Sequence, residues 1–224
     1  KNYGNKLAKQ INLQQATPSN TISPHPAFQG NESTETTHYS VMDSYGNAVS
    51  NTYTLNFSYG TGLIAPETGI LLNNQMDDFT SKPGVPNVFQ FLGSEGNNIA
   101  PEKRMLSSMT PTILMKNNQP WLVTGSPGGS SIITTTLQII LNVIDHEMNI
   151  AEATNATRIH HQWFPDKIRF ERSLNGDTIE LLERKGHQIE RGFAMGSTQS
   201  ILSENGQFYG ASDPRRPGAL TLGY

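Results

Sequence analysis

Paired strand-like segments joined by short polar turns are the clearest feature of the hydrophobic and polar pattern. In residues 36–56, Val, Thr and Tyr alternate with polar positions on both sides of the turn sequence D-S-Y-G-N. Such alternation around a turn cluster predicts a β-hairpin. Two further segments follow the same plan and predict two more hairpins: residues 112–125 around N-N and residues 198–211 around N-G.

The first hairpin has a predicted register. If Asp43 and Asn47 flank the turn, the numbers of paired residues sum to 90. Thr36 then faces Thr54, and Asn56 lies just beyond, because side chains alternate along paired strands. The start of the first strand is therefore expected beside two polar side chains of the second strand.

Helical spacing of Ile and Leu predicts a helix over residues 130–145, directly after the turn S-P-G-G. The capping-box patterns N-x-x-E at 149–152 and D-x-x-E at 177–180 predict two shorter helices, the second ending at Gly186. Strands precede and follow this helical middle without regular β-α-β alternation. The pattern therefore indicates an α+β fold of packed layers.

The first 35 residues differ from the rest of the chain. A few apolar residues among Lys and Gln at 7–13 predict a short helical stretch, and residues 17–30 are rich in Pro, Ser and Asn. We expect an extended, mobile tail over residues 1–35 and a catalytic domain over residues 36–224. The chain also starts without Met or a signal-like segment, which indicates a fragment of a longer precursor.

Composition narrows the functional classes. Lys and Arg number 16 against 19 Asp and Glu, a formal charge of −3, and the basic residues are scattered, which argues against a nucleic-acid surface. The apolar run 137–144 is interrupted by Gln138 and Asn142, far short of the ~20 residues of a membrane span. The absence of Cys excludes disulfides, thiolate zinc sites and Cys nucleophiles.

Thr36 and Thr37 stand where the predicted tail meets the first strand. Thr is common in strands, so the pair has a purely structural interpretation. The alternative requires a cut between Glu35 and Thr36. Thr36 would then carry a hydroxyl and a free α-amine, whose pKa of about 7.7–8.0 suits the base that a Thr nucleophile needs.

Three other clusters also have two interpretations. Gly128 and Gly129, between a strand and a helix, form either a tight turn or an oxyanion hole at the positive end of the helix. Ser107-Ser108 and residues 73–78 are either loops and caps or groups that hold the carboxylate and the ammonium of an amino acid.

Metal and nucleotide sites are not predicted. His160 and His161 are adjacent and therefore point in different directions, and neither they nor His38 belong to an H-E-x-x-H motif. A Walker A loop and a G-x-G-x-x-G turn are also missing from the sequence. We therefore expect no metal and no nucleotide cofactor.

Five motifs follow one another along the chain: T-T-H-Y-S at 36–40, T-L-N at 54–56, L-L-N-N-Q-M-D-D-F at 71–79, L-S-S-M at 106–109 and G-S-P-G-G-S at 125–130. Together they resemble the small subunit of the gamma-glutamyltransferases, also called gamma-glutamyltranspeptidases. The similarity continues to S-D-P-R at 212–215 and to Tyr224, and residues 1–35 resemble the end of the family's large subunit.

This resemblance implies an N-terminal nucleophile hydrolase with a four-layer αββα sandwich, made as an inactive precursor that cuts itself between Glu35 and Thr36. The product would be a heterodimer with the upstream large subunit. Such an enzyme cleaves γ-glutamyl amides, glutathione among them, and transfers the γ-glutamyl group to water, amino acids or peptides. It needs no cofactor, and bacterial members are typically periplasmic or secreted.

The resemblance also assigns roles to individual residues. Thr36 is the nucleophile, and Thr54 hydrogen-bonds to it. Binding of the α-carboxylate further requires an Arg that the family carries in the large subunit. The other implied roles are the oxyanion hole for Gly128 and Gly129, α-carboxylate binding for Ser107 and Ser108, and α-amine binding for Asn56, Gln75 and Asp78.

Two positions depart from the pattern of many bacterial members. Phe89, in the lid loop 83–94, stands where many have Tyr, and Ser131 stands where many have Arg. Phe removes the hydroxyl that can bond across the pocket to the amide of Asn56.

Two other functions remain open from the sequence. A cephalosporin (glutaryl) acylase has a similar fold and self-cleavage, but a glutaryl group has no α-amine for Asp78 to bind. An uncut, inactive relative that serves as a binding module would lack a new N-terminus at Thr36.

Overall fold

The computed structural model describes residues 2–22, 36–82, 85 and 95–224. The chain forms two compact units. Unit 1 consists of Lys1–Gln29 and Thr157–Phe193, and unit 2 of Gly30–Ala156 and Ala194–Tyr224. Unit 2 holds every predicted catalytic and substrate-binding residue that the structure describes.

The first hairpin of unit 2 has the predicted register. Strands β1 (Thr37–Met42) and β2 (Ala48–Tyr53) are antiparallel, with Thr37 opposite Tyr53 and Met42 opposite Ala48. The Asp43 carboxylate fixes the turn, because it accepts hydrogen bonds from the main-chain amides of Tyr45 and Asn47. This local turn chemistry sets which side chains meet at the far end of the hairpin.

A four-stranded sheet of order β3-β4-β8-β9 contains the other two predicted hairpins. Asn117 and Asn118 form the first turn and Asn205 and Gly206 the second, all with positive φ, as a two-residue type I′ turn requires. Pairing of β4 with β8 joins segments far apart in sequence. The strands are β3 (Thr112–Lys116), β4 (Gln119–Thr124), β8 (Gln199–Glu204) and β9 (Gln207–Ser212).

Helices α2 (Ser131–Ile144) and α3 (Ile150–Asn155) pack on this sheet. α2 matches the predicted helix, and Asn149 and Glu152 form the predicted capping box of α3. The apolar faces of the helices and the sheet make one core, which includes Leu122, Ile139, Val143, Ile150, Ala153, Leu202 and Ala211.

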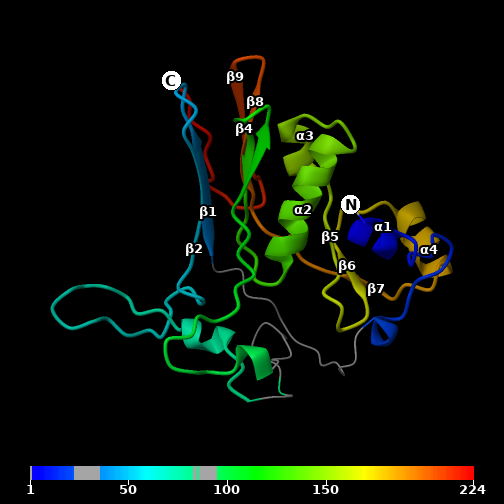
Figure 1. Ribbon diagram of the computed structural model, residues 1–224, viewed down its shortest axis with the longest axis horizontal. Helices are drawn as coiled ribbons and strands as arrows, with labels where there is room; N and C mark the ends of the chain where they lie inside the picture. The colour runs from blue at the N-terminus through cyan, green and yellow to red at the C-terminus, as the bar shows by residue number, and fades with distance from the viewer. Residues whose placement is uncertain (1, 23–35, 83–84, 86–94) are drawn as a thin grey trace. The chain divides into compact units, whose positions relative to one another are not determined.

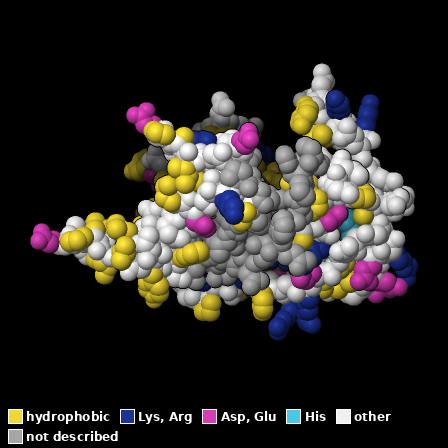
Figure 2. Space-filling model, turned by 90° about the horizontal axis from the view of Figure 1, so that it is seen from below, with side chains coloured by type: hydrophobic (Ala, Val, Ile, Leu, Met, Phe, Trp, Pro, Cys, Tyr) yellow, Lys and Arg dark blue, Asp and Glu magenta, His cyan; other side chains and the backbone are white. Residues whose placement is uncertain are grey.

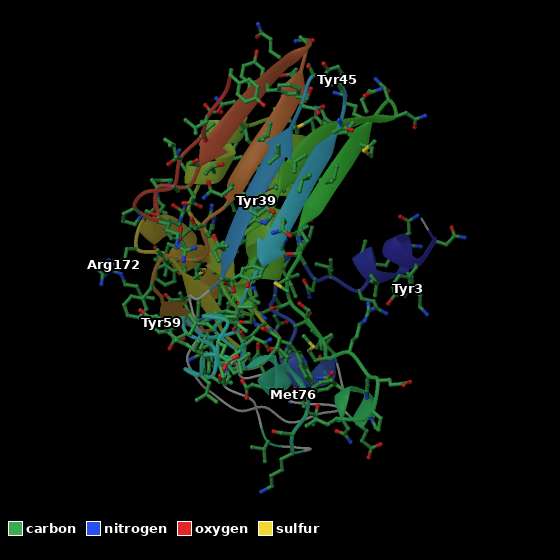
Figure 3. The ribbon with its side chains drawn as sticks, turned by 90° about the vertical axis from the view of Figure 1, so that its left-hand side faces the viewer. Tyr3, Tyr39, Tyr45, Tyr59, Met76 and Arg172 are labelled. Atoms are coloured by element: carbon green, nitrogen blue, oxygen red, sulfur yellow. The ribbon has the colours of Figure 1, made fainter. Side chains whose placement is uncertain are left out.

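Unit 2 is layered. Figure 1 shows the β1–β2 hairpin on one side of the four-stranded sheet and α2 and α3 on the other. In Figure 3 the hairpin lies in front of the larger sheet, its strands running in about the same direction, with Tyr39 on the outer face. These elements make the successive layers β, β and α of the expected sandwich. The mixed α+β class is as predicted.

Unit 1 contains a small sheet that the sequence pattern did not predict. Its strands are β5 (Ile159–His160), β6 (Ile168–Phe170) and β7 (Ile189–Arg191), in that order. β6 and β7 are parallel and are connected through α4 (Gly176–Arg184), so unit 1 includes one β-α-β unit. Strands of two or three residues are too short to show a period-two pattern.

Two details of unit 1 correct the predicted helices. The N-cap of α4 is Asn175, whose side chain accepts a hydrogen bond from the amide of Asp177; the expected capping box starting at Asp177 is wrong. Near the start of the chain, α1 spans Asn2–Ala8 and ends earlier than the apolar stretch at 7–13 indicated. None of the described helices is long and apolar enough to cross a membrane.

Candidate active site

One cavity of unit 2 brings together eight of the predicted site residues. Met109 and Ile132 complete its lining. Gly128 is adjacent in sequence but does not line the cavity, whereas Glu35 and Phe89 lie outside the described residues. The predicted residues that line the cavity are Thr36, Thr54, Asn56, Gln75, Asp78, Ser107, Ser108 and Gly129.

The hairpin supplies one wall of this cavity, here called the strand wall: Thr36, Thr54 and Asn56. The Thr36 hydroxyl donates a hydrogen bond to Oγ1 of Thr54, with 3.1 Å between the two oxygens. The main-chain amide of Asn56 donates to the same oxygen at 2.9 Å. Thr54 therefore orients the Thr36 hydroxyl.

Arg216 also holds Thr36 in place. Its Nη1 donates to the main-chain oxygen of Thr36 at 2.7 Å. The two residues are 180 positions apart, so no local sequence pattern indicates this contact. Sequence reasoning missed Arg216 for that reason.

Asn56 links the strand wall to the opposite side of the cavity. It is buried and has a φ of 76°, a left-handed conformation that Asn adopts more readily than most residues. Its Nδ2 donates to the main-chain oxygen of Asn74 at 3.3 Å, and the Asn74 amide donates to the oxygen of Leu55. The strand end and the loop that carries Gln75 are thus held together.

Gln75 and Asp78 form the opposite wall, here called the loop wall, on the short 3-10 helix η2 (Gln75–Asp78). Nε2 of Gln75 donates to Oδ2 of Asp78 at 2.5 Å. Oε1 of Gln75 is buried without a hydrogen-bond partner among the described residues. A buried acceptor without a partner costs free energy, so this oxygen fits a bound group that donates a hydrogen bond.

The electrostatics of the loop wall also favour a cation. Burial raises the pKa of Asp78 above its usual value; the hydrogen bond from Gln75 opposes this shift, and the nearby charge of Asp77 adds to it. A nearby positive charge stabilises the ionised form of a partly desolvated carboxylate more strongly than that of a carboxylate in water. The wall can therefore bind an ammonium group.

Ser107 and Ser108 differ in how their hydroxyls are used. Ser107 Oγ accepts a hydrogen bond from the amide of Met109 at 3.2 Å, which leaves its own proton available to a ligand. Ser108 Oγ donates to the main-chain oxygen of Gly129 at 2.9 Å. Ser108 thus connects its loop to the glycine pair.

The glycine pair precedes the N-terminus of α2. Gly128 has φ 132° and Gly129 φ 55°, conformations that disfavour other residues. A Cβ at position 128 would lie 2.8 Å from Oγ of Ser131, whose side chain donates to the Gly128 oxygen. This turn places main-chain amides at the positive end of a 14-residue helix, where they can stabilise an anion.

His38 lies on the buried face of β1, two residues after Thr36. Its ring nitrogens hydrogen-bond with Thr52 Oγ1 at 2.8 Å and Ser40 Oγ at 3.2 Å. The ring packs on Gly125, where a Cβ would come within 2.3 Å of Cε1. Burial lowers the pKa of His38 to about 4, so the ring is neutral near pH 7.

Comparison with known proteins shows the family of this chain. The family model described as gamma-glutamyltranspeptidase matches residues 1–222. The glutathione hydrolase proenzyme of Escherichia coli (strain K12) is 56% identical over 225 residues, which cover 100% of this chain and 39% of the relative. The chain thus spans about two fifths of the length of this curated relative.

Solved structures show the same relationship. A gamma-glutamyltranspeptidase of Helicobacter pylori is 51% identical with a TM-score of 0.78, over 80% of this chain and 100% of that chain. A cephalosporin acylase from Bacillus halodurans is 25% identical with a TM-score of 0.64, over 75% of this chain and 30% of that one. The family model and the two gamma-glutamyl relatives confirm the resemblance seen in the motifs, and the chain belongs to the gamma-glutamyltranspeptidase family.

Proposed function

We propose that this chain carries the nucleophile of a self-processing N-terminal threonine hydrolase that acts on γ-glutamyl amides such as glutathione. The observation that carries this proposal is the Thr36 hydroxyl, oriented by Thr54 in a cavity whose opposite wall presents Asp78 and Gln75. The γ-glutamyl group passes to water or to the amine of an amino acid or peptide. No cofactor takes part.

Self-cleavage comes first. The Thr36 hydroxyl adds to the carbonyl carbon of Glu35, and breaking the C–N bond converts the amide into an ester on Thr36 Oγ1. Water then hydrolyses this ester, which releases the Glu35 carboxylate and restores the hydroxyl. Thr36 gains a free α-amine, which accepts the hydroxyl proton in later turnovers, because the neutral Thr54 hydroxyl is too weak a base.

The same hydroxyl then attacks the γ-amide carbonyl of the substrate. The amides of Gly128 and Gly129 stabilise the negative charge on the carbonyl oxygen, and the α-amine returns its proton to the departing amine. A γ-glutamyl ester on Thr36 remains. Water or an acceptor amine displaces it and regenerates the enzyme.

Recognition of the glutamyl group divides between two sets of residues. The α-ammonium is bound by Asp78, by the side chain of Asn56 and by Oε1 of Gln75, which has no hydrogen-bond partner among the described residues. Ser107 donates to the α-carboxylate, and Ser108 serves there too once its hydroxyl turns away from Gly129. A glutaryl group has no ammonium for the loop wall, which favours a γ-glutamyl amidase over a cephalosporin acylase.

Exposed apolar side chains on unit 2 support the proposal that an upstream polypeptide binds there. Tyr39, Val41, Val49 and Tyr53 are exposed on the outer face of the hairpin. The projecting segment 57–72, at the left of Figure 2, also carries exposed hydrophobic side chains, among them Tyr59, Leu63, Ile64 and Ile70. Contiguous exposed apolar surface marks an interaction site. We assign this surface to the large subunit of the same precursor, which also supplies the Arg for the substrate carboxylate.

Family membership also supports a periplasmic or secreted location.

The experiment for the proposed function uses the full-length precursor with its upstream region. Intact-mass analysis should find two polypeptides, one starting at Thr36, and Thr36→Ala should remain a single uncut and inactive chain. Thr36→Ser, which keeps a hydroxyl, should still be cut. Cutting of Thr36→Ala at this bond would refute the nucleophile assignment, and an uncut wild type would indicate a binding module instead.

A further inference from the structure

Ser19 in unit 1 is buried although its sequence neighbours are not. Among the described residues 2–22, Ser19 has a relative exposure of 1%, Ala16 is intermediate and the others are exposed. Burial of a single small polar residue in an otherwise exposed segment indicates a specific attachment point. A core-forming segment would bury apolar side chains instead.

Side chains of the loop 161–166 hold both main-chain groups of Ser19. Its amide donates to Oδ2 of Asp166 at 2.8 Å, and its carbonyl oxygen accepts from Nε1 of Trp163 at 2.8 Å. The Trp163 amide donates to Nδ1 of His161, so the other ring nitrogen of His161 donates to Oδ1 of Asp166, at 3.3 Å. His161 thereby fixes the orientation of the carboxylate.

The charge of Asp166 agrees with this role. Burial raises the pKa of Asp166, but the hydrogen bonds from Ser19 and His161 outweigh that effect, so its pKa lies below its usual value. The carboxylate is therefore ionised near neutral pH. An ionised carboxylate is a strong acceptor for a main-chain amide.

A second attachment lies a few residues earlier, at the end of α4. The Ala16 amide donates to the main-chain oxygen of Lys185 at 2.7 Å, and Nζ of Lys185 donates to the oxygen of Leu13 at 2.8 Å. These four contacts use main-chain atoms of the segment, and the buried side chain of Ser19 adds a hydrogen bond to Asp166. The exposed side chains of the segment make none of these contacts, so the attachment depends on its main chain, on Ser19 and on the residues of 161–185 that hold them.

We propose that residues 13–21 form a clasp with Asp166, Trp163 and Lys185 that keeps the C-terminal end of the upstream polypeptide bound after the precursor is cut. This rests on the proposed cleavage between Glu35 and Thr36. The cut lies downstream of the clasp, so hydrolysis turns a contact within one chain into a contact between two polypeptides. The partner of the surface at 161–185 is thus a segment of the same precursor.

The clasp limits where the new carboxyl end can go. Residues 22–35 span roughly 50 Å when fully extended, so the cut end remains tethered within that radius. Without the clasp, residues 13–21 would also lose their contacts with Asp166, Trp163 and Lys185. The tail is tethered by the clasp without a covalent bond. Its effective concentration near the rest of the protein therefore stays high after the cut.

The test measures amide hydrogen exchange of residues 13–22 in the full-length protein, uncut as Thr36→Ala and cut as wild type. We expect equal protection in both. Trp163→Phe combined with Asp166→Ala should speed exchange at Ser19 about tenfold or more in both forms. Exchange in β6 and β7 should stay unchanged, which shows that unit 1 remains folded.

Two single variants serve as controls. Asp166→Asn keeps an acceptor oxygen and should restore part of the protection. Arg172→Ala changes an exposed site outside these contacts and should leave the protection unchanged.

Loss of protection in the cut wild type, or unchanged protection in the double variant, would overturn the clasp. If the wild type is not cut, the proposed function fails, and a site-specific protease sequence inserted between residues 23 and 35 supplies the cut instead. Protection of residues 13–22 after that cut would still support the clasp, and its loss would refute it. The two proposals therefore fail separately.

Discussion

The two walls of the cavity are built in different ways. The strand wall places Thr36, Thr54 and Asn56 by the register of a hairpin, and the loop wall places Gln75 and Asp78 by a 3-10 turn held through Asn74. In the strand wall, Thr54 Oγ1 accepts hydrogen bonds from Thr36 and from Asn56, whereas the loop wall keeps one acceptor without a partner among the described residues. The difference supports our proposal that Thr36 and Thr54 of the strand wall carry the chemistry, whereas the loop wall, together with Asn56, selects the substrate.

The largest expected effect lies in the strand wall. Thr36→Ala removes the attacking oxygen and should abolish both self-cleavage and turnover, whatever the substrate. Gel analysis of the precursor and an assay of released product check this. Residual γ-glutamyl hydrolysis by pure Thr36→Ala would mean that the chemistry lies elsewhere.

The loop wall should respond in a substrate-dependent way. Asp78→Asn removes the charge that faces the ammonium, and loss of a desolvated ion pair costs about 2–5 kcal/mol, or about 30- to 5,000-fold in kcat/KM. Rates for a glutaryl analogue should change far less, so selectivity falls. Asp145→Asn, an exposed carboxylate outside the cavity lining, is the matched control. Equal losses for both substrates would contradict the division between the walls.

The pH dependence of KM provides a second test of Asp78. Because its pKa is raised, Asp78 takes up a proton at a higher pH than an ordinary Asp as the solution is acidified. The neutral form attracts an ammonium less, so KM for the γ-glutamyl substrate should rise as pH falls toward that pKa. Asp78→Asn should lack this rise. A KM profile unchanged by the substitution would assign ammonium binding to other groups.

Thr54 should give a smaller effect on kcat. Thr54→Val keeps the shape but removes the acceptor that orients the Thr36 hydroxyl, a hydrogen bond worth about 0.5–1.5 kcal/mol. Steady-state kinetics should show kcat falling about 2- to 13-fold with little change in KM. Thr54→Ser should retain most of kcat; if it falls as far as Thr54→Val, packing of the methyl group matters more than the hydrogen bond.

How much of this molecule the sequence predicts depends on how local each contact is. The register of the first hairpin follows from five turn residues, so the meeting of Thr36 and Thr54 was predictable. The roles of Gln75 and Asp78 came from family motifs, because their position depends on contacts of Asn74 with residues 55–57. Arg216 and the clasp involve residues far apart in sequence, and the strands of unit 1 are too short to show a pattern.

The effect expected for His38, behind the strand wall, is on stability. Its folded-state pKa of about 4 lies below the usual 6.5, so the folded protein binds fewer protons than the unfolded chain between these values. Its contribution to stability is complete above pH 6.5 and is lost as pH falls to about 4, on the order of 1–3 kcal/mol. Urea unfolding across this range should show a weaker pH dependence for His38→Gln. An equal dependence would place the titration on other groups.

Locating the acyl-enzyme tests the central claim most directly. The processed wild type is mixed with a γ-glutamyl substrate, quenched in acid during turnover and digested, and the γ-glutamyl ester is mapped by mass spectrometry. We predict the ester on the hydroxyl of Thr36, in the peptide that begins with that residue, and none in Thr36→Ala. An ester on another residue, or turnover without any ester, would contradict the assignment of Thr36 as the nucleophile.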